Sequence, residues 1–389
     1  MHMKKILPGI ITILSLFPVT FAFAQDYNPI PTAMPSLLFA PDARAGGMGD
    51  IGVATMPDLY SQHWNAAKYP FIADDAGISF SYTPWLSKLV SDIHLLYASG
   101  YWKPENDAAD AVSASLRYFT LGGIEVGDMN GEFWQTVSPH ELALDLAYSR
   151  KLTETFAGSV TLRYLRADYS TGNDETAPGN AFSADMAGYN EAYLTLGRSE
   201  ALFGVGFSLS NIGTKISYDG GNSSMFLPAN MRVGASLGIP LNERHTLSFS
   251  TDINKLLVPT PLLAKEGETA EEAQQRIEDY NSISSVAGLF RSLGDAPGGF
   301  REELQEIAWS LGAEYTYINQ LSLRTGYYNE DAYKGNRRYF TFGAGFRSES
   351  FQIDAAYLLS TAHSNPLDQT LRLSLGFDLE GIRNMMRQR

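Results

Sequence analysis

The chain contains no cysteine in 389 residues, so a disulfide framework is excluded and the fold must be held by burial or by a membrane. Basic residues are also few. The 29 Lys and Arg stand against 43 Asp and Glu, which gives a formal net charge of −14. This balance argues against binding to nucleic acid, whose phosphates require a basic surface. After residue 24, no apolar run approaches the ~18 residues of a membrane-spanning helix.

Residue patterns typical of enzymes and of metal sites are missing as well. The sequence has no G-x-S-x-G motif, and its histidines are scattered without the spacing of metal ligands. Residues 47–52 match G-x-G-x-x-G, but Pro41 and Pro57 exclude the preceding strand and the following helix that a dinucleotide site needs. We therefore predict a protein that is not an enzyme and that has no cofactor and no metal.

Residues 1–24 have the pattern of a signal peptide. Lys4 and Lys5 precede a mostly apolar run from Ile6 to Phe23, and residues 22–24 form an A-x-A cleavage site. The alternative is an N-terminal membrane anchor, but the apolar run is short and the cleavage site follows it directly. We expect an exported protein whose mature chain begins at Gln25.

From residue 77 onward, the dominant pattern is alternation with a period of two. In residues 371–378, for example, Leu and Phe take every second position and polar or small residues take the others. Such alternation predicts a strand with one apolar and one polar face, and about 14 runs of this kind have the length of a membrane strand. The expected strands are 77–85, 92–102, 109–119, 140–150, 155–166, 187–198, 201–211, 229–240, 244–255, 307–317, 320–329, 337–347, 350–360 and 369–379.

The connections between these runs are sorted by length. Those after even-numbered strands are short, whereas several after odd-numbered strands are long: 120–139, 167–186, 212–228 and 256–306. Short turns at one end and long loops at the other are typical of an outer-membrane barrel, and a soluble β-sandwich has no reason for such sorting. The pattern predicts that both termini lie on the periplasmic side.

Charged residues within the strands occupy the polar parity of each strand. Because a charge that faces lipid at mid-depth costs about 2–4 kcal/mol, they should face the lumen and pair across it. They are Arg117, Asp145, Arg163, Asp252, Glu314, Arg324, Asp354 and Arg372.

The predicted fold is therefore an all-β transmembrane antiparallel barrel of about 14 strands over residues 77–379. Residues 25–76 should form a periplasmic segment and an N-terminal hatch inside the lumen, because residues 36–71 are rich in Gly and small residues and fit no long helix or strand. In the long extracellular loop 256–306, apolar residues recur at threes and fours from Ala273 to Leu293, which predicts a helix, and another helix should begin near Phe300. Residues 380–389 should form a periplasmic tail.

The hatch segment resembles a known family. Its sequence PDARAGGMGDIGVAT, followed by HWNAAKY, is similar to the PorV family, the outer-membrane barrels of the type IX secretion system of Bacteroidota. More distantly it resembles the FadL-like transporter barrels, where Ala66 of this chain replaces the proline of an Asn-Pro-Ala motif. The hatch-motif residues that the resemblance implies are Asp42, Arg44, Gly46, Gly47, Gly49, Asp50, Gly52, Trp64 and Asn65.

The resemblance implies a location in the outer membrane of a Gram-negative cell and a role as a carrier. Such a protein binds secreted cargo with a C-terminal signal domain, takes it from the type IX translocon and delivers it to a PorU-like sortase. The sortase, with other attachment-complex proteins, removes the signal and attaches the cargo to a lipopolysaccharide anchor. The outer-membrane lipid is a further partner, and nucleic acid is not.

Two loops offer aromatic or apolar residues that could contact cargo. They are Phe133 and Trp134 in 120–139, and Met225 and Phe226 in 212–228. These residues could instead belong to the interfacial belt or to a loop core. Two other functions stay open at this point: a FadL-like transporter of hydrophobic small molecules, and a structural barrel that scaffolds other surface proteins.

Overall fold

The computed structural model of the chain describes residues 27–85, 92–104, 109–127, 133–170, 176–197, 199–221, 224–264, 267–362, 367–379 and 381–383. The predicted signal peptide and residues 384–389 of the predicted tail lie outside these described residues. None of the helices within them is long and apolar enough to cross a membrane.

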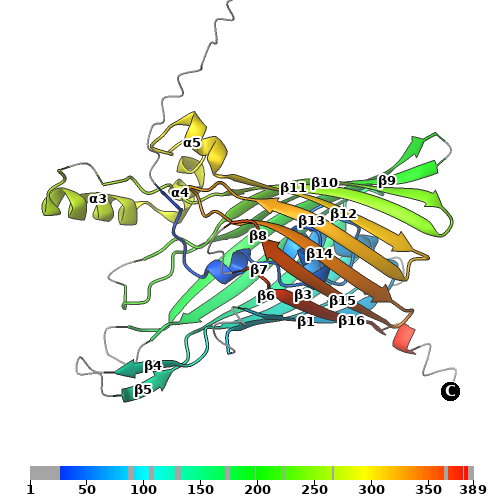
Figure 1. Cartoon of the computed structure of the whole chain (residues 1–389), viewed down its shortest axis with the longest axis horizontal. Helices are drawn as coiled ribbons and strands as arrows, with labels where there is room; N and C mark the ends of the chain where they lie inside the picture. Colours follow the sequence, from blue (N-terminus) through cyan, green and yellow to red (C-terminus); the bar gives the residue numbers. More distant parts are fainter. Residues whose placement is uncertain are drawn as a thin grey trace, which may run out of the picture.

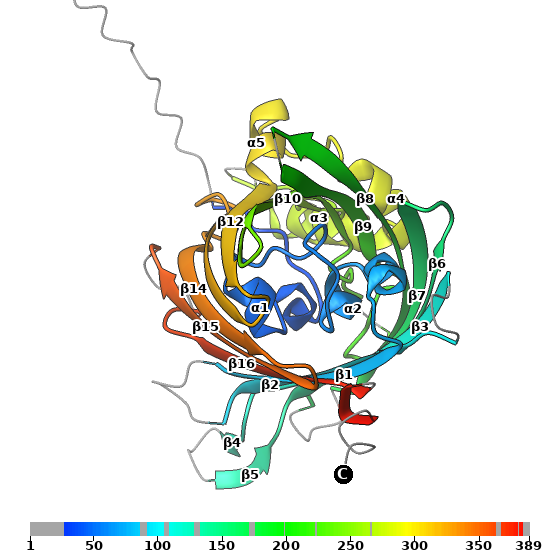
Figure 2. The ribbon, with the colours of Figure 1, turned by 90° about the vertical axis from the view of Figure 1, so that its right-hand side faces the viewer.

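Fourteen antiparallel strands of the described chain close into a barrel, as Figure 2 shows along the barrel, and β1 pairs with β16 to complete the ring. The predicted all-β barrel is thus confirmed. The strands are β1 Ala76–Pro84, β2 His94–Trp102, β3 Asp110–Thr120, β6 His140–Lys151, β7 Phe156–Asp168, β8 Gly179–Leu196, β9 Ser199–Gly213, β10 Asn230–Asn242, β11 His245–Leu256, β12 Ile307–Tyr317, β13 Leu321–Asn329, β14 Arg338–Arg347, β15 Phe351–Ser360 and β16 Leu371–Asp378.

The alternation of each strand sets which residues face the interior. In β16, Leu371, Leu373 and Leu375 are exposed on the outside, whereas Arg372 and Ser374 are buried. This distribution of apolar residues outside and polar residues inside is the reverse of that in a soluble protein, because the outer face of the barrel contacts lipid and the inner face lines the lumen.

Loop length differs between the two ends of the barrel, as predicted. We call one end the short-turn end; its connections are 103–109, 152–155, 197–198, 243–244, 318–320 and 348–350. The other, the long-loop end, carries the connections 85–93, 121–139, 169–178, 214–229, 257–306, 330–337 and 361–370.

Two of the predicted long loops contain strands. Strand β8 begins at Gly179, so the connection expected at 167–186 is only 169–178. Small residues such as Ala181 and Ala184, and a register shift between Ala184 and Met186, obscure the alternation there. Within 120–139, β4 Ile124–Gly127 and β5 Phe133–Val137 form a separate hairpin outside the barrel sheet (Figure 1).

Residues 33–72, which we call the inner segment, lie inside the ring of strands (Figure 2). The segment contains only short elements: η1 Pro35–Leu38, α1 Ala43–Gly46, α2 Ser61–Trp64 and η2 Ala66–Phe71. Frequent Gly and Pro prevent longer helices.

The inner segment crosses the barrel from one end to the other. At the long-loop end, Asn28 N donates to Tyr333 O at 3.0 Å and Ala33 N donates to Phe226 O at 2.9 Å. At the short-turn end, Lys103 Nζ donates to Ile72 O at 2.7 Å, just before β1. The prediction that both termini lie at the same end is therefore wrong for the described residues (Figure 1). An even number of strands places the start of β1 and the end of β16 at the same end of the barrel. The inner segment before β1 crosses the lumen once more, so the described chain starts at the opposite end.

The connection 257–306, which we call the helical segment, contains α3 Ala270–Ser282, α4 Ser285–Arg291 and α5 Phe300–Gln305. Thr269 and Glu272 form a capping box that starts α3. The apolar stripe from Ala273 to Leu293 is interrupted after Ser282 because Ser284 caps a new helix by accepting a hydrogen bond from Ala287 N. Helix α3 projects away from the strands (Figure 1).

Candidate functional site: the interior of the barrel

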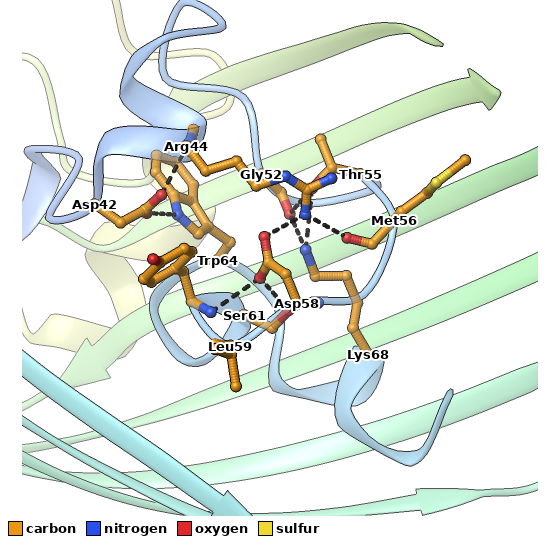
Figure 3. Close-up of polar contacts among 12 residues, drawn as sticks. Asp42, Arg44, Gly52, Thr55, Met56, Asp58, Leu59, Ser61, Trp64 and Lys68 are labelled. Atoms are coloured by element: carbon orange, nitrogen blue, oxygen red, sulfur yellow. Dashed lines mark hydrogen bonds and ion pairs between the residues drawn. The ribbon is translucent and has the colours of Figure 1, made fainter. Parts of the chain in front are cut away.

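Arg44 is the centre of the polar contacts inside the barrel. Its guanidinium forms an ion pair with Asp58, donates to Met56 O at 2.9 Å and reaches Glu314 Oε1 of β12 at 3.2 Å. Asp58 in turn accepts hydrogen bonds from Ser61 Oγ at 2.9 Å and from Tyr60 N at 3.0 Å (Figure 3). The cluster fixes a loop of the inner segment to itself and to the wall.

Asp42 joins the two short helices of the inner segment. Its Oδ1 accepts from Ala45 N at 2.8 Å, which caps α1, and its Oδ2 accepts from Trp64 Nε1 at 2.7 Å (Figure 3). The Trp64 ring is covered in turn by the Arg232 guanidinium of β10, whose central carbon lies 4.8 Å from the ring centroid. These contacts link α1, α2 and the barrel wall.

Ion pairs of the wall hold the other side of the segment. Arg372 Nη1 lies 2.6 Å from Asp50 Oδ1, and Tyr339 Oη donates to Asp50 Oδ2 at 2.7 Å. Arg324 pairs with Glu314 and, at 2.6 Å, with Asp354. Breaking a buried pair of this kind leaves an uncompensated charge, so the Arg372–Asp50 pair resists displacement of the segment, whereas the Arg324 pairs hold the wall strands to one another.

The predicted inward orientation of the charged strand residues is confirmed, because their side chains are buried in the interior. Their partners differ from the predicted pairing across the lumen. Arg163 pairs with Asp145 on the neighbouring strand, and Arg117 donates to Ser36 O at 2.6 Å. The inner segment occupies the space between opposite walls, so several of these charged side chains contact the segment and not the opposite wall.

Glycines allow the segment to approach the wall closely. Gly49 has φ +80° and its N donates to Thr341 Oγ1 at 2.8 Å. A Cβ on Gly326 of β13 would lie 2.0 Å from the backbone carbon of Met48. Backbone therefore packs on backbone here, which only glycine permits.

Asn65 and Asp252 anchor the second half of the segment. Asn65 Nδ2 donates to Val53 O and to Gly188 O, both at 2.9 Å, and its Oδ1 accepts from Ala67 N at 3.0 Å. Asp252 Oδ2 accepts from Gly52 N at 2.9 Å and from Val53 N at 3.1 Å. The turn after Asn65 is thus held by hydrogen bonds, although Ala66 stands where the FadL-like motif has proline.

The predicted hatch residues all lie in the inner segment and are all buried: Asp42, Arg44, Gly46, Gly47, Gly49, Asp50, Gly52, Trp64 and Asn65. Sequence reasoning missed Asp58 and Lys68. Lys68 is buried, and its Nζ donates to Gly52 O at 2.8 Å and to Thr55 Oγ1 at 3.1 Å (Figure 3). The sequence could have indicated both residues, since each is a charged residue in a stretch of mainly small and apolar residues.

Spaces lined by both polar and apolar residues lie on both sides of the inner segment. One, of about 650 Å³, faces the long-loop end and is lined by Arg232, Glu306, Lys334 and other residues. Another, of about 750 Å³, faces the short-turn end and is lined by Arg44, Glu314 and others. No group of three or more His, Asp or Glu in the described part of the chain could hold a metal ion.

The candidate cargo-contact residues have different positions. Met225 is partly exposed, whereas Phe226 is only 5% exposed and packs edge-to-face with Tyr280 of α3 at 5.7 Å between centroids. Of the two alternatives for Phe226, its burial under the helical segment fits a loop-core residue and not an exposed anchor. Phe133 and Trp134 begin β5, and their side chains lie outside the described part of the structure.

Solved structures with a similar fold are transport barrels. A deletion mutant of the monoaromatic hydrocarbon channel TodX has a TM-score of 0.50 at 12% identity, covering 86% of this chain and 98% of that chain. The toluene transporter TodX of Pseudomonas putida has a TM-score of 0.49 at 12% identity over 91% and 99% of the two chains. A FadL homologue of Pseudomonas aeruginosa has a TM-score of 0.41 at 12% identity over 90% and 99%. At such identity, the first of these supports the fold alone.

The sequence also matches a family. No curated protein sequence matches the chain. The profile of the family described as "Type IX secretion system protein PorV" matches residues 22–263, which is more than half of the 389 residues. The match includes the whole inner segment and ends within the helical segment. The chain therefore belongs to the PorV family and is an outer-membrane β-barrel protein of the type IX secretion system.

Proposed function

We propose that this protein carries secreted proteins with a C-terminal signal domain from the type IX translocon to a PorU-like sortase. The sortase, together with other attachment-complex proteins, would remove the signal domain and attach the cargo at the cell surface. The long-loop end would face the outside and the short-turn end the periplasm. The inner segment would act as a hatch that keeps the barrel closed during this exchange.

The observation that carries the proposal is the contrast between the interior and the long-loop end. The inner segment is fixed inside the barrel by buried ion pairs such as Arg372–Asp50 and Arg44–Glu314. The long-loop end, by contrast, carries the helical segment and the hairpin of β4 and β5. A closed barrel with extensive loops at one end suits a protein that binds a macromolecule at its surface.

Affinity purification from outer membranes, with mass spectrometry of the proteins that accompany the barrel, tests this function. We expect secreted proteins that retain their signal domains, and we expect more of them in cells without the sortase. A barrel that is isolated alone in both strains would contradict the carrier function.

Met225 is the better of the two described candidates for a cargo-contact variant. Charge at Phe226 would disturb the helical segment, whereas Met225 is 38% exposed at the long-loop end. We expect Met225→Glu to reduce cargo recovery in the purification, while Leu152→Glu, an exposed leucine at the short-turn end, leaves it unchanged. Equal recovery of cargo with both variants would show that Met225 does not contact cargo.

A second candidate function is transport of hydrophobic small molecules, which the fold of the TodX mutant favours. The spaces beside the inner segment are lined by charged side chains as well as apolar ones, and the buried charges disfavour passage of an apolar solute. Uptake of a hydrophobic substrate by cells with and without the protein distinguishes the two functions. A barrel that is purified alone with such a ligand would favour transport.

A further inference from the structure

Helix α4 lies beside the barrel wall and does not cover the lumen. In Figure 2 it lies at the rim of the ring of strands, by β8, and it lines one space together with Leu162 of β7 and Phe182 of β8. On its inner side, a Cβ on Gly288 would lie 2.8 Å from the Phe226 ring and 3.1 Å from Pro259, so the helix packs directly on these residues. On the other side, Val286 and Phe290 are 63% and 74% exposed. Helix α4 thus presents an apolar face that no described residue covers.

An apolar groove separates α4 from the outer wall. Its α4 side is formed by Val286 and Leu289, and its wall side by Leu162 of β7 and Phe182 of β8. The space measures about 1060 Å³, including its open side. The remaining lining residues are also mainly apolar or small.

The wall side of the groove belongs to the surface that faces lipid. Leu162 and Phe182 are 64% and 66% exposed and point outward from the barrel. Beyond them toward the long-loop end, Tyr164 Oη donates to Asn180 Oδ1 at 2.7 Å, and the Tyr164 ring contacts the Phe182 ring at a tilted angle. A Tyr next to polar residues is typical of the girdle at the bilayer surface. The groove therefore lies at the outer edge of the apolar belt and is continuous with it.

A bulge in the wall makes room for the groove. The pairing of β8 with β9 shifts register between Ala184 and Met186, and Asn211 of β9 has φ +59°. At the floor, the Asn211 side chain is already engaged, because it accepts a hydrogen bond from Arg163 and donates to Pro228 O at 3.0 Å. The Asn211 amide is thus not free for a polar ligand. The buried Ser183 hydroxyl of the groove has no hydrogen-bond partner among the described residues, but the rest of the lining is mainly apolar, which favours an apolar occupant.

We propose that this groove binds an acyl chain of a lipid in the outer leaflet, and that α4 lies in the membrane surface beside it. The membrane is the occupant that the observations favour, because the groove continues the lipid-facing wall at the depth where acyl chains begin. An apolar helix face at a membrane boundary is buried by lipid in the same way as an interfacial amphipathic helix. The site is separate from the proposed cargo function, and only the choice of leaflet rests on the orientation proposed with that function.

The absence of cysteine allows a direct test with single labelled positions. Val286→Cys, labelled with bimane, is reconstituted into bilayers of phosphatidylcholine with brominated acyl chains, which quench a probe that they contact. Leu162→Cys on the wall is the positive control, and Phe300→Cys on α5, 78% exposed, is the matched negative control. We expect quenching at 286 to be similar to that at 162 and several-fold stronger than at 300.

A second variant separates binding in the groove from mere closeness to the bilayer. Leu289→Trp should fill the groove, so native mass spectrometry of the detergent-released protein should find fewer retained lipids than for the wild type, while Leu304→Trp on α5 retains the wild-type number. Quenching at 286 that is no stronger than at 300 would overturn the proposal. Shielding of 286 from soluble iodide only when other secretion proteins are present would also overturn it, because a protein would then cover α4.

Discussion

At the scale of single residues, the inner segment depends on positions where a side chain would not fit. Gly326 of the wall contacts the Met48 backbone, and Gly343 contacts Gly47, where an added Cβ would lie 3.0 Å from Gly343 Cα. These contacts explain why Gly occurs in the inner segment and again in strands that otherwise carry larger residues. The inner segment can approach the wall this closely only where glycines of the segment and of the strands lie opposite backbone atoms.

Gly326→Ala is expected to destabilise the packed interior. The new Cβ would overlap the Met48 carbonyl carbon, and overpacking of this kind costs roughly 1–3 kcal/mol. The measurement is the temperature at which the barrel loses its folded migration on a gel, together with protease cleavage of the inner segment. Gly158→Ala is the control, because a Cβ there would meet its nearest neighbour at an ordinary 3.6 Å. Equal transition temperatures for the two variants would contradict this account.

Arg324→Met is expected to lower the free energy of unfolding by about 3–5 kcal/mol, because it leaves Glu314 and Asp354 buried without that partner. Arg150→Met removes an exposed pair with Asp110 and should cost only about 0–1 kcal/mol. Denaturant unfolding of the protein in detergent provides the comparison. If both substitutions have the same small effect, the buried network does not hold the interior together.

At the scale of elements, the helical segment is tied to the barrel by Lys334 of the 330–337 connection. Lys334 Nζ pairs with Glu302 of α5 and lies 3.0 Å from Glu306 Oε1. Asn28 Nδ2 also donates to Glu302 Oε1 at 3.3 Å, so the start of the described chain takes part in the same contact. One carboxylate thus joins three separate parts of the long-loop end.

This contact makes the attachment of the helical segment dependent on pH. Burial alone would raise the pKa of Glu302, but hydrogen bonds from Lys334 and Gly298 N outweigh it and hold the pKa below its ordinary value of 4.5. A lowered pKa in the folded state means that stability is present above pH 4.5 and is lost as the pH falls through the lowered value. We expect acid-active protease to cleave residues 257–306 faster as the pH falls in this range.

Lys334→Met provides the control for this pH dependence. The variant should be cleaved faster than the wild type already at neutral pH, and its cleavage should change less as the pH falls. A wild-type cleavage rate that stays constant below pH 4.5 would show that Glu302 does not tether the segment.

At the scale of the whole molecule, the crossing of the inner segment places the two ends of the described chain at opposite ends of the barrel. Asn28 bonds to residues of the long-loop end, whereas β16 finishes at the short-turn end. With the long loops outside, the mature N-terminus would be displayed at the cell surface beside α5. This places it next to the loops that we propose for cargo binding.

An epitope inserted between Asp26 and Tyr27 is therefore expected to bind antibody on intact cells, because Tyr27 is exposed at the long-loop end. The same epitope after Arg389 should become accessible only after the outer membrane is permeabilised. If antibody on intact cells labels the C-terminal epitope and not the N-terminal one, the barrel has the orientation opposite to the one that we propose.

The sequence by itself determined the barrel, the parity of its strands and the sorting of its loops. These properties are local: a period of two along a strand fixes which side chains face lipid, and residues such as Arg324 and Asp354 reveal the lumen side because a charge facing lipid is costly. It also indicated the hatch residues, through the motif that begins at Asp42 and ends at Asn65 and its resemblance to a family. The predicted strand 187–198 missed the first half of β8, because small residues and a bulge interrupt the alternation there.

Only the tertiary structure decided how distant parts meet. The ion pair of Asp50 with Arg372 joins residues at opposite ends of the sequence and exists only because the ring closes around the inner segment. In the same way, the burial of Phe226 depends on helices that lie some sixty residues later, and no local pattern indicates that they fold back over it. The direction in which the inner segment crosses the lumen is likewise set by its contacts at both ends, not by its own sequence.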